Sequence, residues 1–375
     1  MGSSNKLFHV LQGRIPGLAE HTLDPKTPAP FLHADPWLLA SLLQKAVRRG
    51  ELAMARRAGH QLLNVDPTRL WRRVMVTALE DIGLGDPDCA VLLVGLAALP
   101  QARRLLGSNG AALDVALRLG CEAVKDRSGD GFGSIAREMA LAVESHSLND
   151  ASTNARLAVL ASSYLPWRRR LRAALLLAES DAMAAERALA FAPISEVFRA
   201  QGVPGELMDA CEVYRFKARD PLAFFVPLAY GMWLGQGAPR ATITHGLPAP
   251  GFIGELPDYT FDPIRTRLGR RAVDLWLRSY LEKPPFDARQ VAIALWNMES
   301  GACARTLDWP LGREIKEQGA FADYAGRGVP LGGHEALMAW VAKEQSVLAC
   351  ARTAVWQSAL RDETSRACQL PLAAE

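Results

Sequence analysis

The sequence of 375 residues contains none of the short motifs that identify the common enzyme classes. It has no G-x-x-x-x-G-K-[ST] loop for nucleotide phosphates, no G-x-S-x-G nucleophile elbow and no H-E-x-x-H metal site. Two glycine-rich stretches, GDGFGS at 129–134 and GRGVPLGGH at 326–334, follow no apolar strand and carry no lysine in register, so we interpret both as turns. The sequence therefore predicts no ATP hydrolysis by a phosphate-binding loop, no catalytic residue, no metal site and no cofactor.

Cysteine is scarce and shows no ligand spacing. The chain has no C-x-x-C pair, and several of its cysteines lie in apolar runs, which favours buried free thiols in a reducing compartment. The N-terminal stretch MGSSNKLFHVLQG lacks the apolar core and cleavage site of a signal peptide, so we expect a cytoplasmic protein. The six cysteines are Cys89, Cys121, Cys211, Cys303, Cys350 and Cys368.

A long uninterrupted apolar run is also missing. The uncharged segment 221–239 comes nearest, but three prolines and three glycines interrupt its 19 residues. We interpret this segment as a buried helix broken at Pro227, and we expect no membrane partner.

Neither sign of charge dominates the chain. Lys and Arg number 43 and Asp and Glu number 40, which leaves a net charge of +3. A composition of 49% hydrophobic and 22% charged residues is that of a globular protein, and the length is sufficient for two or three cores of domain size. Any attraction for nucleic acid must therefore come from local clusters of arginine.

Helical periodicity is the main pattern that is present. Asp-Pro pairs at 35–36, 66–67 and 86–87 have the form of a helix N-cap followed by proline at the first helical position. They open predicted helices from about 37, 67 and 87, and a helix over about 51–63 follows the first closely enough to form an antiparallel hairpin. Later helices are predicted over about 101–124, 134–146, 151–165, 167–190, 193–201, 267–282, 286–300 and 334–361.

Convincing strand alternation is absent, so the predicted fold class is all-α, built of stacked antiparallel helical hairpins. We divide the chain into an irregular N-terminal arm (1–34), a helical-hairpin domain (35–236) and a C-terminal region (237–375). The stretch at 125–134 is predicted as a glycine-rich loop. The C-terminal region opens with a long irregular connection rich in Gly and Pro, at 237–264, and connections of this length are often functional.

The most informative segment is 41–87, where two basic amphipathic helices lead into the turn Glu80-Asp81-Ile82-Gly83-Leu84-Gly85-Asp86-Pro87. Over about 37–98 the chain resembles the C-terminal helical domain of the MgsA/RarA (Werner helicase-interacting protein) family of replication-associated AAA+ ATPases, whose turn reads S-E-D-[IV]-G-L-[AG]-[DN]-P. The ATPase module is not part of the resemblance. The resemblance implies action on single-stranded or branched DNA, a separately encoded AAA+ ATPase or clamp-loader component as partner, and a homo-oligomer.

Within this turn we expect structural roles. Gly83 would take a positive φ at a helix end, and Asp86 would cap the next helix. Glu80 and Asp81 would pair with neighbouring arginines and so fix the hairpins relative to one another.

Three clusters are the candidate binding surfaces for nucleic acid or a partner. The first cluster, between Lys45 and Arg73, contains eight basic and two acidic residues. It includes Arg48, Arg49, Arg56 and Arg57. The second opens a helix with Arg168, Arg169 and Arg170. The third mixes aromatic rings with guanidinium groups, a combination suited to stacking on exposed bases or to an acidic partner. It consists of Tyr259, Phe261, Arg265, Arg267, Arg270 and Arg271.

Each cluster has a structural alternative. The first is also typical of a solvated outer face, and the second could instead pair with an acidic neighbouring helix. The third is also typical of an interdomain clamp in which Asp258 and Asp262 pair with Arg265 or Arg267. Three hypotheses for function follow: a non-enzymatic accessory protein of DNA replication or recombination, a protein-interaction scaffold whose arginines hold its own helices, and an enzyme with a site in the 237–271 loop. A deep closed pocket that contains His245, Asp258 and Asp262 would support the enzyme hypothesis, and a flat solvent-facing loop would exclude it.

Overall fold

A computed structural model describes residues 2–15, 17–18, 29–31, 34–141, 146–183, 187–237, 241–280, 283–330 and 332–367. The first third of the chain is a series of short helices. Its elements are α1 (Ser3–Arg14), α2 (Pro36–Arg49), α3 (Leu52–Val65), α4 (Pro67–Thr77), the π-helix η2 (Ala78–Ile82), the 3-10 turn η3 (Gly83–Gly85), α5 (Pro87–Ala98), α6 (Pro100–Arg104) and α7 (Asn109–Glu122).

Helices continue through the middle and the end of the chain. The middle contains α8 (Ser128–Leu141), α9 (His146–Asn149), α10 (Thr153–Ala161), α11 (Trp167–Met183), α12 (Arg187–Ala200), α13 (Gly205–Ala218) and α14 (Leu222–Gln236). The last part contains the 3-10 turn η5 (Asp258–Thr260), α15 (Arg267–Arg278), α16 (Ala288–Leu295), the π-helix η6 (Trp296–Ser300), α17 (Pro310–Ala325), α18 (Gly333–Lys343) and α19 (Gln345–Ala367). The all-α fold class is confirmed.

Two short antiparallel pairs of strands lie in the C-terminal region. Strand β1 (Ala241–Thr244) pairs with β4 (Arg305–Asp308), and β2 (Phe252–Ile253) pairs with β3 (Leu256–Pro257). The predicted irregular connection at 237–264 is therefore partly ordered as strands, because partners distant in sequence complete the hydrogen bonding of its backbone.

The three Asp-Pro pairs begin helices as predicted. The side chains of Asp35, Asp66 and Asp86 accept hydrogen bonds from backbone N–H groups in the first turns of α2, α4 and α5. At the other end of α2, Gly50 takes a left-handed conformation with φ of 72°. Local capping chemistry thus places the helices of the first hairpins correctly.

Three other expectations need correction. Residues 3–14 of the predicted irregular arm form α1, with Leu7 and Leu11 buried. Helix α14 continues through Pro227, because its buried side chains pack against α8, α11 and α13 strongly enough to offset the lost hydrogen bond. Most of the predicted loop at 125–134 belongs to α8.

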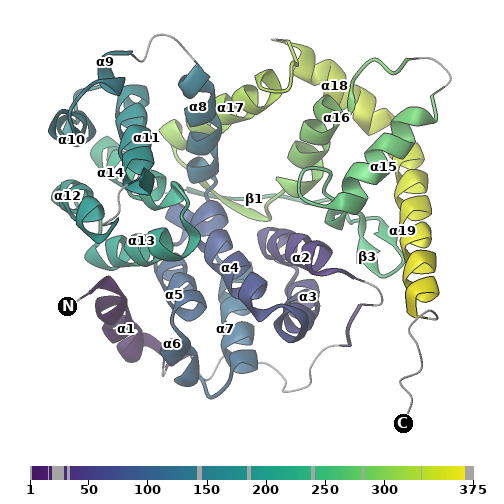
Figure 1. Ribbon diagram of the computed structural model, residues 1–375, viewed down its shortest axis with the longest axis horizontal. Helices are drawn as coiled ribbons and strands as arrows, with labels where there is room; N and C mark the ends of the chain where they lie inside the picture. The colour runs from purple at the N-terminus through teal and green to yellow at the C-terminus, as the bar shows by residue number, and fades with distance from the viewer. Residues whose placement is uncertain are drawn as a thin grey trace.

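The glycines of α8 serve close packing and not a turn. Helices α8 and α17 cross with very little space between their backbones, as seen where they lie side by side (Figure 1). A Cβ added to Gly319 would lie 2.7 Å from the Cα of Gly131, and one added to Gly131 would lie 2.9 Å from the carbonyl oxygen of Ile315. Glycine is required here because any side chain would force the two helices apart.

One apolar core joins most of the molecule. It extends from Leu7 of α1 to Trp356 of α19 and includes Phe261 and Ile315, so the C-terminal region packs into the core of the hairpin domain. A second, smaller core lies among α15, α16, α18 and α19, where the rings of Trp276 and Trp340 stack with centroids 5.0 Å apart. Figure 1 shows these four helices together on one side of the molecule, opposite α9 to α14. In the described part of the chain, no helix combines the length and apolar character needed to cross a bilayer.

Candidate functional site

The acidic turn lies at the centre of the molecule, in the π-helix η2. Arg48 is 2% exposed and forms ion pairs with both carboxylates, from Nη2 to Glu80 Oε1 at 3.1 Å and from Nε to Asp81 Oδ1 at 2.5 Å. Gln44 donates a further hydrogen bond to Asp81 at 2.8 Å. Burial disfavours the charged guanidinium, but Asp81 and Glu80 hold the pKa of Arg48 above its ordinary value. These bonds fasten α2 to the turn.

Two more arginines reach the same turn from distant parts of the sequence. Arg265 Nη2 lies 3.1 Å from Glu80 Oε1. Arg127 pairs with Asp130 at 2.7 Å, and its Nε lies 3.8 Å from Asp81 Oδ1. Burial by itself would raise the pKa of Glu80, but the guanidinium groups of Arg265 and Arg48 lower it to about 2. The Glu80 carboxylate therefore stays charged, whereas burial raises the pKa of Asp81 against the opposing effect of Arg48. Together the two side chains join α2, the start of α8 and the segment before α15.

The rest of the turn has the geometry expected of a structural element. Gly83 has a positive φ of 45°. The Asp86 carboxylate accepts a hydrogen bond from the backbone N–H of Cys89 at 3.0 Å, which caps α5.

A second buried ion pair connects α2 to the segment that follows β3. Lys45 Nζ lies 3.2 Å from Asp262 Oδ2 and donates to the carbonyl oxygen of Tyr259. Burial lowers the pKa of Lys45 to about 8 although Asp262 opposes the shift. The expected pairing of Asp262 with Arg265 or Arg267 is replaced by this lysine, while Asp262 accepts the backbone N–H of Arg265.

Both aromatic rings of the third cluster are buried. Tyr259 and Phe261 are each 1% exposed. The Tyr259 hydroxyl donates to Glu51, and Phe261 packs edge-on against Trp356 with centroids 6.0 Å apart. Neither ring face is available to stack on a base, so the mixed aromatic and arginine surface expected from the sequence does not form.

Most arginines of the first two clusters are engaged within the chain. The arginines of the first cluster pair with carboxylates, whereas Arg168 and Arg170 bind neutral amide or carbonyl oxygens and keep their charge. Arg48 pairs with Glu80 and Asp81, Arg49 with Glu51 and the Pro248 carbonyl, Arg56 with Asp114, Arg57 with Glu255 and the Ala29 and Pro30 carbonyls, Arg168 with Gln318, and Arg170 with Gln201 and the Leu160 carbonyl. Arg169 is exposed.

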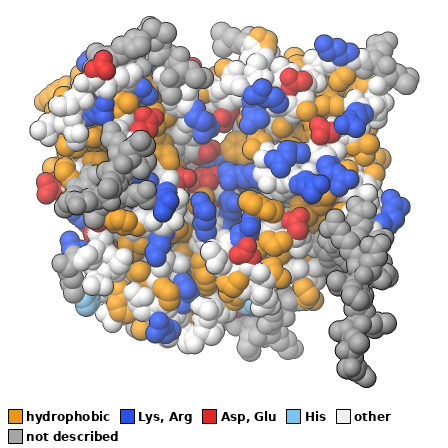
Figure 2. Space-filling view, viewed as in Figure 1, with side chains coloured by type: hydrophobic (Ala, Val, Ile, Leu, Met, Phe, Trp, Pro, Cys, Tyr) orange, Lys and Arg blue, Asp and Glu red, His pale blue; other side chains and the backbone are white. Residues whose placement is uncertain are grey.

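The arginines of α15 are different because they face solvent. Thr266 caps this helix, and its buried side includes Leu268, Ala272 and Trp276. On the opposite side, six exposed residues recur at helical spacing, and the four arginines among them, beside Asp274 and Leu275, form what we call the α15 arginine row. The row consists of Arg267, Arg270, Arg271 and Arg278. Figure 2 shows Lys and Arg side chains gathered on this face of the molecule, beside a central hollow.

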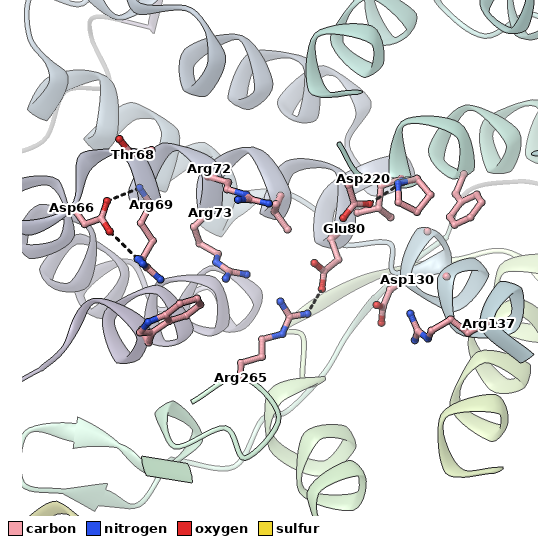
Figure 3. Close-up of a pocket in the computed structure, with 17 residues that line it drawn as sticks. Asp66, Thr68, Arg69, Arg72, Arg73, Glu80, Asp130, Arg137, Asp220 and Arg265 are labelled. Carbon is pink, nitrogen blue, oxygen red and sulfur yellow. Dashed lines mark hydrogen bonds and ion pairs between the residues drawn. The ribbon is translucent and has the colours of Figure 1, made fainter. Parts of the chain in front are cut away.

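The hollow contains a cavity of about 670 Å³, which we call the arginine cavity (Figure 3). Arg72 and Arg73 of α4 enter it from one side and Arg265 from the opposite side. Arg73 Nη1 donates to the amide oxygen of Gln44 at 2.7 Å. Neither Arg72 nor Arg73 forms an ion pair with a described carboxylate. Burial, together with repulsion from Arg265, lowers the pKa of Arg73 to about 10.

The cavity around His245 does not support the enzyme hypothesis. His245 lines a different cavity, of about 480 Å³, and its Nε2 lies 2.8 Å from Thr306 Oγ1. Asp262 is buried against Lys45, and Asp258 accepts the backbone N–H of Gly251, so neither lines that cavity. Among the described side chains, no group of three or more histidine, cysteine or carboxylate residues is arranged to hold a metal ion.

The arginine cavity itself was not singled out from the sequence. Arg72 and Arg73 belong to the basic stretch that ends at Arg73, but no local pattern distinguishes them from the paired arginines before them. No protein-family profile, curated protein or solved structure matches this chain. The function must therefore be argued from the residues and their geometry.

Proposed function

We propose that the chain is a non-enzymatic accessory protein of DNA replication or recombination that binds single-stranded or branched DNA along the α15 arginine row. The observation that carries this proposal is the contrast among its arginines. Arg48, Arg49, Arg56 and Arg57 of the first cluster form ion pairs within the chain. Arg267, Arg270 and Arg271 instead extend into solvent from one face of one helix. The resemblance of residues 37–98 to the MgsA/RarA family supports the choice of DNA as the polyanion.

Binding of this kind would rest on phosphate contacts. Tyr259 and Phe261 are buried and provide no stacking platform, so base identity should matter little. Each phosphate neutralised on a single strand contributes about 0.7 to the slope of log K against log salt concentration. Affinity should therefore fall steeply with salt, in spite of a net charge of only +3.

The test is fluorescence anisotropy of a labelled single-stranded oligonucleotide over a series of salt concentrations. Arg270→Gln with Arg271→Gln should weaken binding and reduce the salt slope by about 1.4, because two phosphate contacts are lost. The control, Arg104→Gln with Arg118→Gln, removes the same charge from α6 and α7, which lie away from α15 (Figure 1). The proposal fails if the wild type does not bind at low salt or if both double variants behave alike.

A scaffold function is the second candidate, because Arg49, Arg56 and Arg57 bind the chain's own carboxylates. Under this alternative, charge reversal in α15 would leave nucleic-acid binding unaffected, and partners would be proteins. A pull-down from native lysate with and without nuclease separates the two. A partner ATPase or clamp-loader component retained after nuclease treatment, together with no DNA binding by the pure protein, would favour the scaffold.

A further inference from the structure

The arginine cavity has a charge imbalance that its own residues do not resolve. Three of its four carboxylates are paired with arginines, and the fourth, Asp220, lies near Arg72, whose positive charge it partly offsets. Glu80 binds Arg48 and Arg265, Asp66 caps α4 and pairs with Arg69, Asp130 pairs with Arg127, and Asp220 accepts the backbone N–H of Leu222. Arg72 and Arg73 face the same space with no ion pair to a described carboxylate. Arg73 is therefore the cation in this cavity that an anion would complement.

Arg73 is the centre of this imbalance. Its guanidinium is half-buried and donates a hydrogen bond to the neutral amide of Gln44 at 2.7 Å, with no ion pair to a carboxylate of the described residues. Burial lowers the pKa of Arg73, and Arg265, which lies across the cavity, lowers it further by repulsion. Two guanidinium groups that face one another match the planar, multidentate hydrogen bonding of a phosphate.

Part of the remaining wall is apolar and aromatic, and the rest carries polar and charged side chains that include Asp130, Arg137 and Asp220. Trp37 lines the cavity and is 56% exposed, which is unusual for a tryptophan. Arg69 Cζ lies 3.9 Å from the centre of the Trp37 ring, and Asp66 holds Arg69 in turn. Val76 and Phe225 continue the apolar surface. A volume of about 670 Å³ is within the usual range for small-molecule sites.

We infer that the arginine cavity binds a phosphate monoester carried on a nucleoside, with the phosphate between Arg72, Arg73 and Arg265 and the base against Trp37. Two sources share this chemistry: a free nucleotide, and the phosphorylated end of a DNA strand. A strand lying on the α15 arginine row would have its end close to Arg265, since this residue directly precedes α15. The cavity's affinity for a free nucleotide does not depend on that arrangement.

Calorimetry with the purified full chain at low ionic strength tests the inference. Adenosine 5′-monophosphate is one probe, compared with adenosine and with inorganic phosphate. The second pair of probes is an oligonucleotide with a 5′-phosphate and the same oligonucleotide with a 5′-hydroxyl. Wild type should bind the nucleotide more tightly than adenosine or phosphate alone, or should prefer the phosphorylated strand.

Arg73→Gln provides the decisive comparison. It should weaken the phosphate-dependent binding about tenfold to a hundredfold, because one charge-assisted contact is lost. It should not lower the melting temperature of the free protein, because the residue removed is a half-buried cation without a counter-ion. Arg104→Gln with Arg118→Gln should change neither property.

The inference is overturned if no probe shows phosphate-dependent binding, if inorganic phosphate binds as well as the nucleotide, or if Arg73→Gln binds like the wild type. Failure of the proposed DNA-binding function looks different. In that case Arg270→Gln with Arg271→Gln would have no effect on the oligonucleotides, while the nucleotide would still require Arg73.

Discussion

Glu80 offers the sharpest test of how the molecule is held together. It is nearly buried, and its Oε1 receives both Arg48 and Arg265 at 3.1 Å. These partners lower its pKa from 4.5 to about 2, a difference that corresponds to about 3 kcal/mol of folding free energy at neutral pH. Removing one partner of a buried ion pair lowers the free energy of unfolding by a similar amount, about 3–5 kcal/mol. We expect Glu80→Gln to lower the free energy of unfolding by about 3 kcal/mol at pH 7.

The pH dependence of this loss has a definite sign. The pKa of Glu80 is lowered by folding, so its contribution is complete above its unfolded value of 4.5 and disappears as the pH falls towards 2. The wild type and Glu80→Gln should therefore differ by a constant amount from about pH 6 to pH 8. At pH 3 the difference should be less than about half of its value at pH 7.

Urea denaturation followed by tryptophan fluorescence measures the difference, and the nine tryptophans give a strong signal. The matched control is Glu255→Gln, which removes a carboxylate paired with Arg57 but 48% exposed. Exposed ion pairs contribute at most about 1 kcal/mol, so this control should change little. A loss below about 1 kcal/mol for Glu80→Gln, or a difference that stays constant to pH 3, would refute the reasoning.

Two further predictions concern the packing between the hairpin domain and the C-terminal region. Gly319→Ala should cost about 1–3 kcal/mol by thermal or urea unfolding, because its Cβ would lie 2.7 Å from Gly131 Cα, whereas Gly235→Ala, with open space around it, should be neutral or slightly stabilising. Lys45→Met should lower the free energy of unfolding by about 3 kcal/mol, because it separates the buried Asp262 carboxylate from its lysine partner. Adding Asp262→Asn to this variant should lower it much less than a second independent loss would. If the two losses are additive, the residues are not coupled.

The sequence predicted those parts of the fold that depend on neighbouring residues. Asp35, Asp66 and Asp86 cap helices because capping involves hydrogen bonds within three residues. Gly50 ends α2 for the same kind of local reason. The sequence wrongly predicted a loop at the glycines of α8. Gly131 allows α8 to pack closely against α17, which is distant in the sequence, and no local pattern indicates such a crossing.

The candidate site was less accessible to prediction for the same physical reason. Arg48 and Arg270 are the same residue type on amphipathic helices, yet Arg48 is buried against Glu80, 32 positions away, whereas Arg270 faces solvent. Arg265 meets Glu80 across 185 positions. Whether an arginine is free for a ligand is decided by such long-range partners, which composition and helical period do not specify.

The acidic turn and the arginine cavity form one electrostatic system. Glu80 and Asp81 pair with Arg48, and Glu80 pairs with Arg265, so the turn stabilises the fold. The two carboxylates offset the charge of Arg73 only in part and form no ion pair with it. A protein selected only for stability would gain by replacing Arg73 with a neutral side chain, because its guanidinium is half-buried beside Arg265. Its position in a cavity with an exposed tryptophan gives it a use that requires the free charge. If Arg73→Gln melts higher than the wild type and also loses the nucleotide, stability and binding oppose one another at this residue, as expected of a ligand site. If it melts lower, Arg73 serves the fold, and the cavity has no need of an anion.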